Sequence, residues 1–125
     1  MLLSCDGGGL RGLIIARCLE RLEALEGSPC REIFDFFAGT STGAIIIGAL
    51  LAGLPAGKIV ELYKKQGKQM FKKRMFWNWL WWRYSKKYVR EIFRDIFGDR
   101  KLQDFLPRHV LIMAKDTVRS ETIFL

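Results

Sequence analysis

The sequence has few of the residues that build metal sites or covalent frameworks. It contains three cysteines, Cys5, Cys18 and Cys30, in no CxxC pair, and a single histidine, His109. An odd number of scattered thiols without a second histidine fits neither a zinc site nor a disulfide framework. We therefore expect no metal, no cofactor and a reducing compartment.

Long hydrophobic runs are also missing. The longest, Ala44 to Leu54, contains two glycines and is shorter than the roughly 20 residues that cross a bilayer. The N-terminus lacks the basic and apolar regions of a secretory signal, so we expect a cytoplasmic chain without a membrane span. Low-complexity sequence is absent too. With 125 residues that are 50% hydrophobic, we expect residues 1–125 to form one folding unit around a single core.

Positive charge is concentrated in the middle of the chain. The net charge is +8, and between residues 58 and 101 basic residues far outnumber Glu61, Glu91, Asp95 and Asp99. Within this segment, Lys72–Arg83 interleaves lysine and arginine with all four tryptophans. Such a composition suits the headgroup level of a bilayer, where indoles anchor and cations meet anionic lipid. It predicts peripheral membrane contact.

Two alternatives remain open for the basic segment. Its tryptophans could pack in a core beneath a solvated lysine face. The same residue types also bind single-stranded nucleic acid, in which bases stack on indoles and cations meet phosphates. Competition between lipid and oligonucleotide would separate the two ligands. We expect lipid and no nucleic acid as the partner.

Apolar runs and helical periodicities alternate along the chain. Short apolar runs at Leu2–Cys5, Ile33–Ala38 and Val110–Ala114 are typical of buried strands, and Ser120–Leu125 begins a further one. Helical spacing predicts helices over residues 13–26, 44–52, 55–71 and 89–97. This order indicates an α/β fold, with a parallel sheet, right-handed crossovers and helices on both faces.

Gly39-Thr40-Ser41-Thr42-Gly43 lies between a predicted strand and a predicted helix. It fits the G-x-S-x-G pattern of a nucleophile elbow, where small flanking residues permit a strained turn that exposes the serine hydroxyl. The following helix would direct backbone N–H groups and a positive dipole end toward Ser41. From the pentapeptide alone, the alternative is a glycine-rich turn in which Ser41 only caps the helix.

Asp6-Gly7-Gly8-Gly9-Leu10-Arg11-Gly12 follows the first predicted strand. Its glycines would let backbone N–H donors approach a developing oxyanion closely. Gly7, Gly9 and Gly12 also fit the dinucleotide-binding fingerprint G-x-G-x-x-G, so a dinucleotide-binding module is the alternative function. That fingerprint expects an acidic residue ending the second strand, where this chain has Gly39-Thr40-Ser41. Both turns follow strands of one parallel sheet, so we expect them to face one site.

Together the two motifs resemble the patatin-like phospholipase family, whose signature is D-G-G-G-x-[RK]-G followed by G-x-S-x-G. Looser similarity covers Leu102, Leu106, Pro107 and Val110–Asp116. The resemblance implies a patatin-like α/β fold and a serine acyl hydrolase of lipid esters, of the phospholipase A or lysophospholipase kind, with a Ser-Asp dyad. It implies Ser41 as nucleophile, an oxyanion hole at Gly7, Gly8, Gly9, Arg11 and Gly12, an elbow of Gly39, Thr40, Thr42 and Gly43, and a lipid or phospholipid substrate.

The chain departs from the family at the catalytic base. The family's aspartate lies in a D-G-[GA] motif downstream of the serine, and no such motif follows Ser41. Asp95, Asp99 and Asp104 fall in helical or capping contexts, and Asp116 adjoins a strand that is not catalytic in the family. We therefore expect a truncated patatin-like domain that lacks its catalytic aspartate and is inactive by itself.

His109 offers an alternative to the dyad. A Ser-Asp-His triad would follow the chain order of α/β-hydrolases. However, His109 stands next to Arg108 and just before a predicted buried strand, a context that favours a surface or capping histidine. A third hypothesis is a non-catalytic domain that binds membrane or nucleic acid through the basic tryptophan segment.

Overall fold

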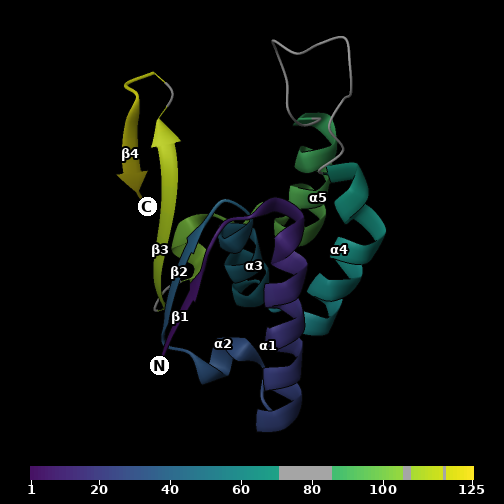
Figure 1. Cartoon of the computed structure of the whole chain (residues 1–125). Coiled ribbons are helices and arrows are strands. Elements are labelled where there is room, and N and C mark those ends of the chain that lie inside the picture. The colour runs from purple at the N-terminus through teal and green to yellow at the C-terminus, as the bar shows by residue number, and fades with distance from the viewer. Residues whose placement is uncertain (71–85, 106–107, 117) are drawn as a thin grey trace.

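The computed structural model describes residues 1–70, 86–105, 108–116 and 118–125 (Figure 1). One four-stranded sheet has the order β1-β2-β3-β4. Its strands are β1 (Leu2–Cys5), β2 (Phe36–Thr40), β3 (His109–Asp116) and β4 (Glu121–Phe124). The first three are mutually parallel, and β4 runs antiparallel to β3. The predicted α/β class is confirmed.

The direction of β4 follows from the length of its connection. Residues 117–120 alone separate β3 from β4, whereas a crossover between parallel strands needs about a dozen residues or more. A short connection can only form a hairpin. The last strand therefore departs from the fully parallel sheet that the sequence predicts.

Four of the five helices occupy predicted positions. The helices are α1 (Gly12–Glu26), α2 (Cys30–Ile33), α3 (Thr42–Leu51), α4 (Ala56–Met70) and α5 (Lys86–Phe97), with short 3₁₀ turns η1 (Gly9–Arg11) and η2 (Leu102–Phe105). Helix α2 was not predicted and includes Ile33, so β2 begins at Phe36 and not at Ile33. In Figure 1 the helices lie together on one side of the sheet, with α3 against β1 and β2 and α1 alongside α4. Helix α1 ends at Gly27, whose φ of 66° suits glycine.

This arrangement differs in one respect from the prediction of helices on both faces. Strands β1, β2 and β3 follow one another in a single direction across the sheet. Right-handed crossovers between strands added in one direction place every connection on the same side. The burial of β3 alternates accordingly: Val110 and Ile112 are half-buried under the helices, while Leu111 and Met113 are exposed on the other face.

The core lies between the sheet and the helices. Its largest fully buried side chains include Phe37 of β2 and Ile46, Ile47 and Leu50 of α3. Each such side chain stabilises the fold by about 1.5–3 kcal/mol relative to an exposed one. Helix α3 is buried around most of its circumference, because it is enclosed by the sheet and by the other helices. Helix α3, which begins within the second glycine-rich turn, is thereby held against β1 and β2.

Glu23 of α1 joins three helices. Its Oε1 accepts the N–H of Cys30, the first residue of α2, at 2.9 Å, and its Oε2 accepts the N–H of Ala56, the first residue of α4, at 2.8 Å. Backbone N–H groups in the first turn of a helix have no partner within that helix. Glu23 supplies a hydrogen-bond acceptor to the first N–H of α2 and to that of α4, and so fixes the start of α4 against α1.

Some sequence predictions fall outside the described residues. The segment Lys72–Arg83 lies within residues 71–85, and Leu106 and Pro107 are likewise not described.

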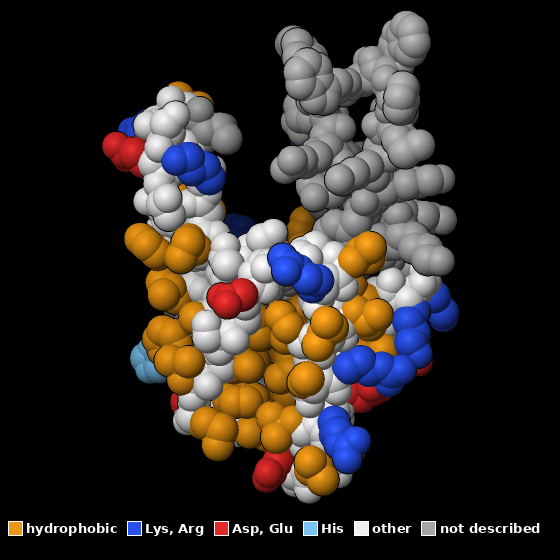
Figure 2. Space-filling view, viewed as in Figure 1, with side chains coloured by type: hydrophobic (Ala, Val, Ile, Leu, Met, Phe, Trp, Pro, Cys, Tyr) orange, Lys and Arg blue, Asp and Glu red, His pale blue; other side chains and the backbone are white. Residues whose placement is uncertain are grey.

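Figure 2 shows exposed Lys and Arg side chains gathered beside the α1–α4 face, with hydrophobic side chains across the middle of the view. Within the described ranges, no helix is long and apolar enough to cross a membrane.

Candidate active site

The two glycine-rich turns meet at one edge of the sheet. Cys5 of β1 pairs with Gly39 of β2, so the two parallel strands end side by side. A Cβ atom added to Gly7 would lie 2.7 Å from Cβ of Ser41, 3.1 Å from the Thr40 carbonyl oxygen and 3.4 Å from Ser41 Oγ. Only glycine leaves room for so close an approach. The structure thus brings the first motif directly against Ser41.

Ser41 has a strained backbone. Its φ is 52° and its ψ is −124°, a conformation that costs a residue with a side chain about 1–3 kcal/mol. Ser41 stands at the N-cap position of α3, yet its side chain makes no capping hydrogen bond. The residue is exposed. The alternative that Ser41 serves only as a helix cap is therefore wrong, and its hydroxyl is left for another use.

The glycines on either side of Ser41 provide space. A Cβ on Gly43 would lie 1.9 Å from the carbonyl oxygen of Cys5. A Cβ on Gly39 would lie 2.6 Å from Ile47 Cδ1 and 2.8 Å from the Ala44 nitrogen. The first turn of α3 can therefore press against the ends of both β1 and β2, with the positive end of its dipole beside Ser41.

Thr42 links the elbow to the glycine loop. Its side chain is buried, with 3% of the residue exposed, and its Oγ1 accepts the N–H of Gly8 at 3.2 Å. A hydrogen bond also joins the side chains of Thr42 and Tyr63. Burial raises the pKa of Tyr63 to about 12, and the bond to Thr42 opposes that rise. The sequence placed Tyr63 on the apolar face of a helix and did not indicate its bond to Thr42. The one available signal is that a buried tyrosine hydroxyl usually has a hydrogen-bond partner.

The rest of the first motif completes the loop. Gly9 has a φ of 59°, which glycine adopts without strain. The N–H of Arg11 donates to the Gly8 carbonyl oxygen at 3.2 Å. The exposed Arg11 side chain folds back, so that its Nε would lie 3.2 Å from a Cβ on Gly8. Gly12 opens α1 beneath Tyr63, whose hydroxyl oxygen would lie 2.3 Å from an added Cβ.

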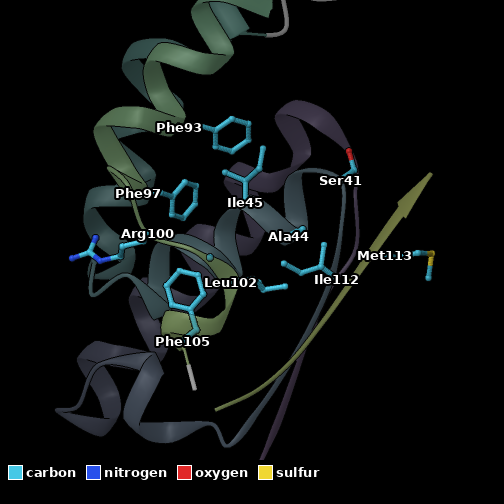
Figure 3. Close-up of a pocket in the computed structure, with 11 residues that line it drawn as sticks. Ser41, Ala44, Ile45, Phe93, Phe97, Arg100, Leu102, Phe105, Ile112 and Met113 are labelled. Atoms are coloured by element: carbon cyan, nitrogen blue, oxygen red, sulfur yellow. The ribbon is translucent and has the colours of Figure 1, made fainter. Parts of the chain in front are cut away.

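An apolar cavity opens beside Ser41. Its volume is about 400 Å³. Figure 3 shows its lining residues, which come from the Ser41 turn, α3, α5, η2, β3 and the α5–η2 connection: Ser41, Ala44, Ile45, Gly48, Phe93, Phe97, Arg100, Leu102, Phe105, Ile112 and Met113. The Met113 side chain points away from the cavity. Phe93 and Phe97 are one helical turn apart, with ring centroids 5.7 Å apart. The sequence placed both on the apolar face of a helix but did not indicate a cavity.

None of the aspartates after Ser41, all of which are described, is placed as a base. Asp104 caps η2, where its Oδ2 accepts the Lys101 N–H at 2.7 Å. Asp116 Oδ1 accepts the N–H groups of Val118 at 2.8 Å and Arg119 at 3.2 Å in the β3–β4 turn. Asp95 and Asp99 are exposed and do not line the cavity.

The geometry excludes His109 as a triad member within this chain. His109 begins β3 and pairs with Phe36, on which its ring stacks at 6.3 Å. Ser41 follows Thr40, which pairs with Met113 at the other end of the same ladder. Four residues of strand separate the two positions, about 13 Å at 3.3 Å per residue.

The thiols of the buried cysteines are poorly suited to nucleophilic chemistry. Cys5 and Cys30 are buried and unpaired. Burial raises the pKa of the Cys5 thiol to about 11 and that of Cys30 to about 12, with Asp6 and Glu23 as the respective charged neighbours. Thiols so protonated are weak nucleophiles. In the described part of the chain, no three His, Cys, Asp or Glu side chains gather as they would around a metal ion.

A serine at positive φ between a parallel strand and a helix, with a glycine loop against it, defines an α/β protein with the elbow geometry described for hydrolases. The model of the Patatin-like phospholipase family matches residues 3–124, and the chain belongs to that family. The resemblance found in the two motifs is confirmed.

The chain is also similar to individual proteins named as phospholipases or patatin-like proteins. The chain is 32% identical to the cGAMP-activated phospholipase of Pseudomonas aeruginosa over 90% of its own length and 35% of that protein. It is 33% identical to Patatin-like protein 2 of Arabidopsis thaliana, over 88% of this chain and 32% of that protein. It is 41% identical to human calcium-independent phospholipase A2-gamma over 56% of this chain and 9% of that protein. The chain thus spans about a third or less of these relatives.

Proposed function

We propose that this chain carries the nucleophile and oxyanion hole of a serine acyl hydrolase of lipid esters, of the phospholipase A or lysophospholipase kind. One observation carries the proposal: Ser41 is strained and exposed, makes no capping bond, and lies between a glycine loop and an apolar cavity. The names of the relatives, all phospholipases or patatin-like proteins, support it.

In the proposed reaction, Ser41 Oγ attacks the ester carbonyl carbon and forms an acyl-enzyme as the alcohol leaves. Water then hydrolyses the acyl-enzyme and releases the fatty acid. Backbone N–H groups of the Gly7–Gly9 loop would stabilise the oxyanion. Since the Gly8 N–H already donates to Thr42, Gly8 would anchor the loop, and Gly7 and Gly9 would supply the donors. Arg11 and Gly12 would shape the same loop.

The base is proposed to be an aspartate outside these residues. The aspartates after Ser41 are engaged in caps or point to solvent, and a carboxylate can activate the serine only within hydrogen-bond reach. The 125 residues by themselves would then form a partial domain with little turnover. We propose that the whole protein, with its downstream aspartate, is the active species.

The cavity defines the proposed substrate. Its walls are almost entirely hydrocarbon and aromatic, so it suits the acyl chain of a lipid ester. Each buried methylene contributes about 0.8 kcal/mol. The proposed setting is cytoplasmic, with peripheral membrane contact through Lys72–Arg83, whose cations and indoles suit an anionic bilayer surface.

No observation favours dinucleotide binding. Such a module needs open space at the glycines for a pyrophosphate. Here Gly7 faces Ser41, Gly12 lies under Tyr63, and the Gly8 N–H is bound to Thr42.

The test is fatty-acid release from phospholipid vesicles by the full-length protein that contains this chain. Ser41→Ala should lower release more than 1,000-fold, because the nucleophile is lost. Ser4→Ala, a matched serine on the exposed face of β1, should leave release unchanged. Retained activity in Ser41→Ala would refute the proposal. Neither variant should change the far-UV circular dichroism.

A further inference from the structure

We infer that Tyr63 is a positioning residue for acyl transfer, holding Thr42 so that the glycine loop keeps its place against Ser41. The inference rests on the proposed function and deepens it. Tyr63 touches no reacting atom. It acts through two hydrogen bonds that connect helix α4 to the loop after β1.

The position of Tyr63 is set by the backbone around it. Helix α4 packs along α1, and Glu23 fixes the start of α4 by accepting the Ala56 N–H. The Tyr63 side chain reaches across the first residue of α1. A Cβ on Gly12 would lie 2.3 Å from its hydroxyl oxygen and 2.8 Å from Cζ. The tip of the ring therefore rests on the backbone where the glycine loop becomes helix.

Thr42 is the connection between Tyr63 and the loop. It directly follows Ser41 and is almost fully buried. A threonine in a helix divides between two side-chain rotamers, because its hydroxyl can bond to the helix backbone. The bond to Tyr63 selects the rotamer in which Oγ1 meets the Gly8 N–H. Gly7, the neighbour of Gly8, is the residue in closest approach to Ser41.

The state of the phenol separates positioning from proton transfer. Burial raises the pKa of Tyr63 to about 12, so the hydroxyl remains protonated throughout the neutral range. A general acid or base would make the ratio of wild-type to Tyr63→Phe kcat vary with pH. A positioning residue leaves that ratio constant between pH 6 and about 9, since neither bond changes there.

The experiment measures kcat and KM of the full-length protein and its rate of labelling by a fluorophosphonate probe. Tyr63→Phe should lower kcat and the labelling rate about 3- to 10-fold, the effect of one hydrogen bond, with KM within twofold. Thr42→Val, which removes both bonds, should lower kcat further. The double variant should equal Thr42→Val within twofold, because Tyr63 acts through Thr42.

A structural control lies on the same helix. Val60→Ala removes buried volume three residues before Tyr63, and Val60 is 2% exposed. It should lower the unfolding midpoint at least as much as Tyr63→Phe and leave kcat at 25 °C unchanged. Should Thr42→Val not fold, the pH-independent kcat ratio of Tyr63→Phe decides the matter.

Different results overturn different claims. If Ser41→Ala retains activity, the proposed function fails and the role of Tyr63 fails with it. If Ser41→Ala is inactive but Tyr63→Phe turns over like wild type, only the positioning role is overturned. The positioning role is also overturned if the kcat ratio changes with pH. It is likewise overturned if Tyr63→Phe has as large an effect in the Thr42→Val background as in wild type.

Discussion

The turns after β1 and β2 are both rich in glycine, but for different reasons. After β2, positive φ falls on Ser41, while Gly39 and Gly43 give room for α3 against the strand ends. After β1, positive φ falls on Gly9, and Gly7 gives room for Ser41 itself. One turn presents a strained side chain and the other presents only backbone.

This difference shows where the fold accepts strain. Among described residues, positive φ occurs at glycines and at two serines, Ser41 and Ser120. Ser120 lies in the turn of the β3–β4 hairpin, where such a conformation is ordinary. At Ser41, glycine would fit the backbone better but would carry no hydroxyl. Backbone strain kept at a residue with a reactive group indicates function.

The largest effect is expected at Gly43. In Gly43→Ala, the new Cβ would meet the Cys5 carbonyl oxygen at 1.9 Å, so α3 must leave the end of β1. We expect labelling of Ser41 to fall more than 1,000-fold and the free energy of unfolding to fall by more than about 3 kcal/mol. Fluorophosphonate labelling and urea unfolding measure both.

Gly57 provides the control for that substitution. A Cβ there would meet only the carboxylate end of Glu20, at 3.2 Å, and Gly57 lies in the first turn of α4. Gly57→Ala should therefore raise the free energy of unfolding by about 0.5–1 kcal/mol. Equal behaviour of the two variants would show that space at Gly43 is not the constraint.

Gly7 tests the other turn. Its Ala variant places a Cβ 2.7 Å from that of Ser41, which displaces the loop without disturbing the core. We expect kcat to fall about 100- to 1,000-fold, the effect of losing an oxyanion-hole donor, with stability changed by less than about 1 kcal/mol. Steady-state kinetics of the full-length protein measure this. Wild-type kcat in Gly7→Ala would remove the loop from the mechanism.

The two buried cysteines, Cys5 at the end of β1 and Cys30 at the start of α2, allow a test with pH. The pKa is about 11 for Cys5 and about 12 for Cys30, against 9.0 in the unfolded chain. Above pH 9 the unfolded state has therefore released protons that the folded state retains. Stability is fully present below pH 9. It should fall as pH rises toward 11 and 12, by about 1.4 kcal/mol per pH unit for each thiol.

Urea unfolding between pH 8 and 11 measures that slope. Cys30→Ala should make the fall of the free energy of unfolding with pH shallower, whatever the effect of the substitution on stability at pH 8. Cys18→Ala, at an exposed position, is the matched control and should leave the slope as in wild type. A slope unaffected by Cys30→Ala would contradict the assignment.

The smallest effect compares two inactive variants. Ser41→Gly and Ser41→Ala both lack the hydroxyl, but only glycine adopts φ 52° and ψ −124° without strain. The strain of about 1–3 kcal/mol exceeds the entropy cost of glycine, about 0.5–1 kcal/mol. We expect Ser41→Gly to be more stable by about 1 kcal/mol in urea unfolding. Equal stability would mean that the elbow carries no strain.

The sequence predicted the parts of this comparison that depend on local pattern. A G-x-S-x-G between an apolar run and a helical period requires a sharp turn at Ser41, and the glycines after β1 require a loop. Strand order leaves no mark in local periodicity, so the placement of the helices on one face could not be predicted. The roles of Tyr63 and Phe97 at the site could not be predicted either, because helical spacing is the same for a residue in a core and for one beside a cavity.

The central claim is that Ser41 is the nucleophile. It is tested most directly by treating the full-length protein with a fluorophosphonate and mapping the adduct by peptide mass spectrometry. We expect one adduct, on Ser41, formed in step with the loss of fatty-acid release from vesicles and absent from Ser41→Ala. An adduct on another residue that abolishes activity while Ser41 stays unmodified would contradict it.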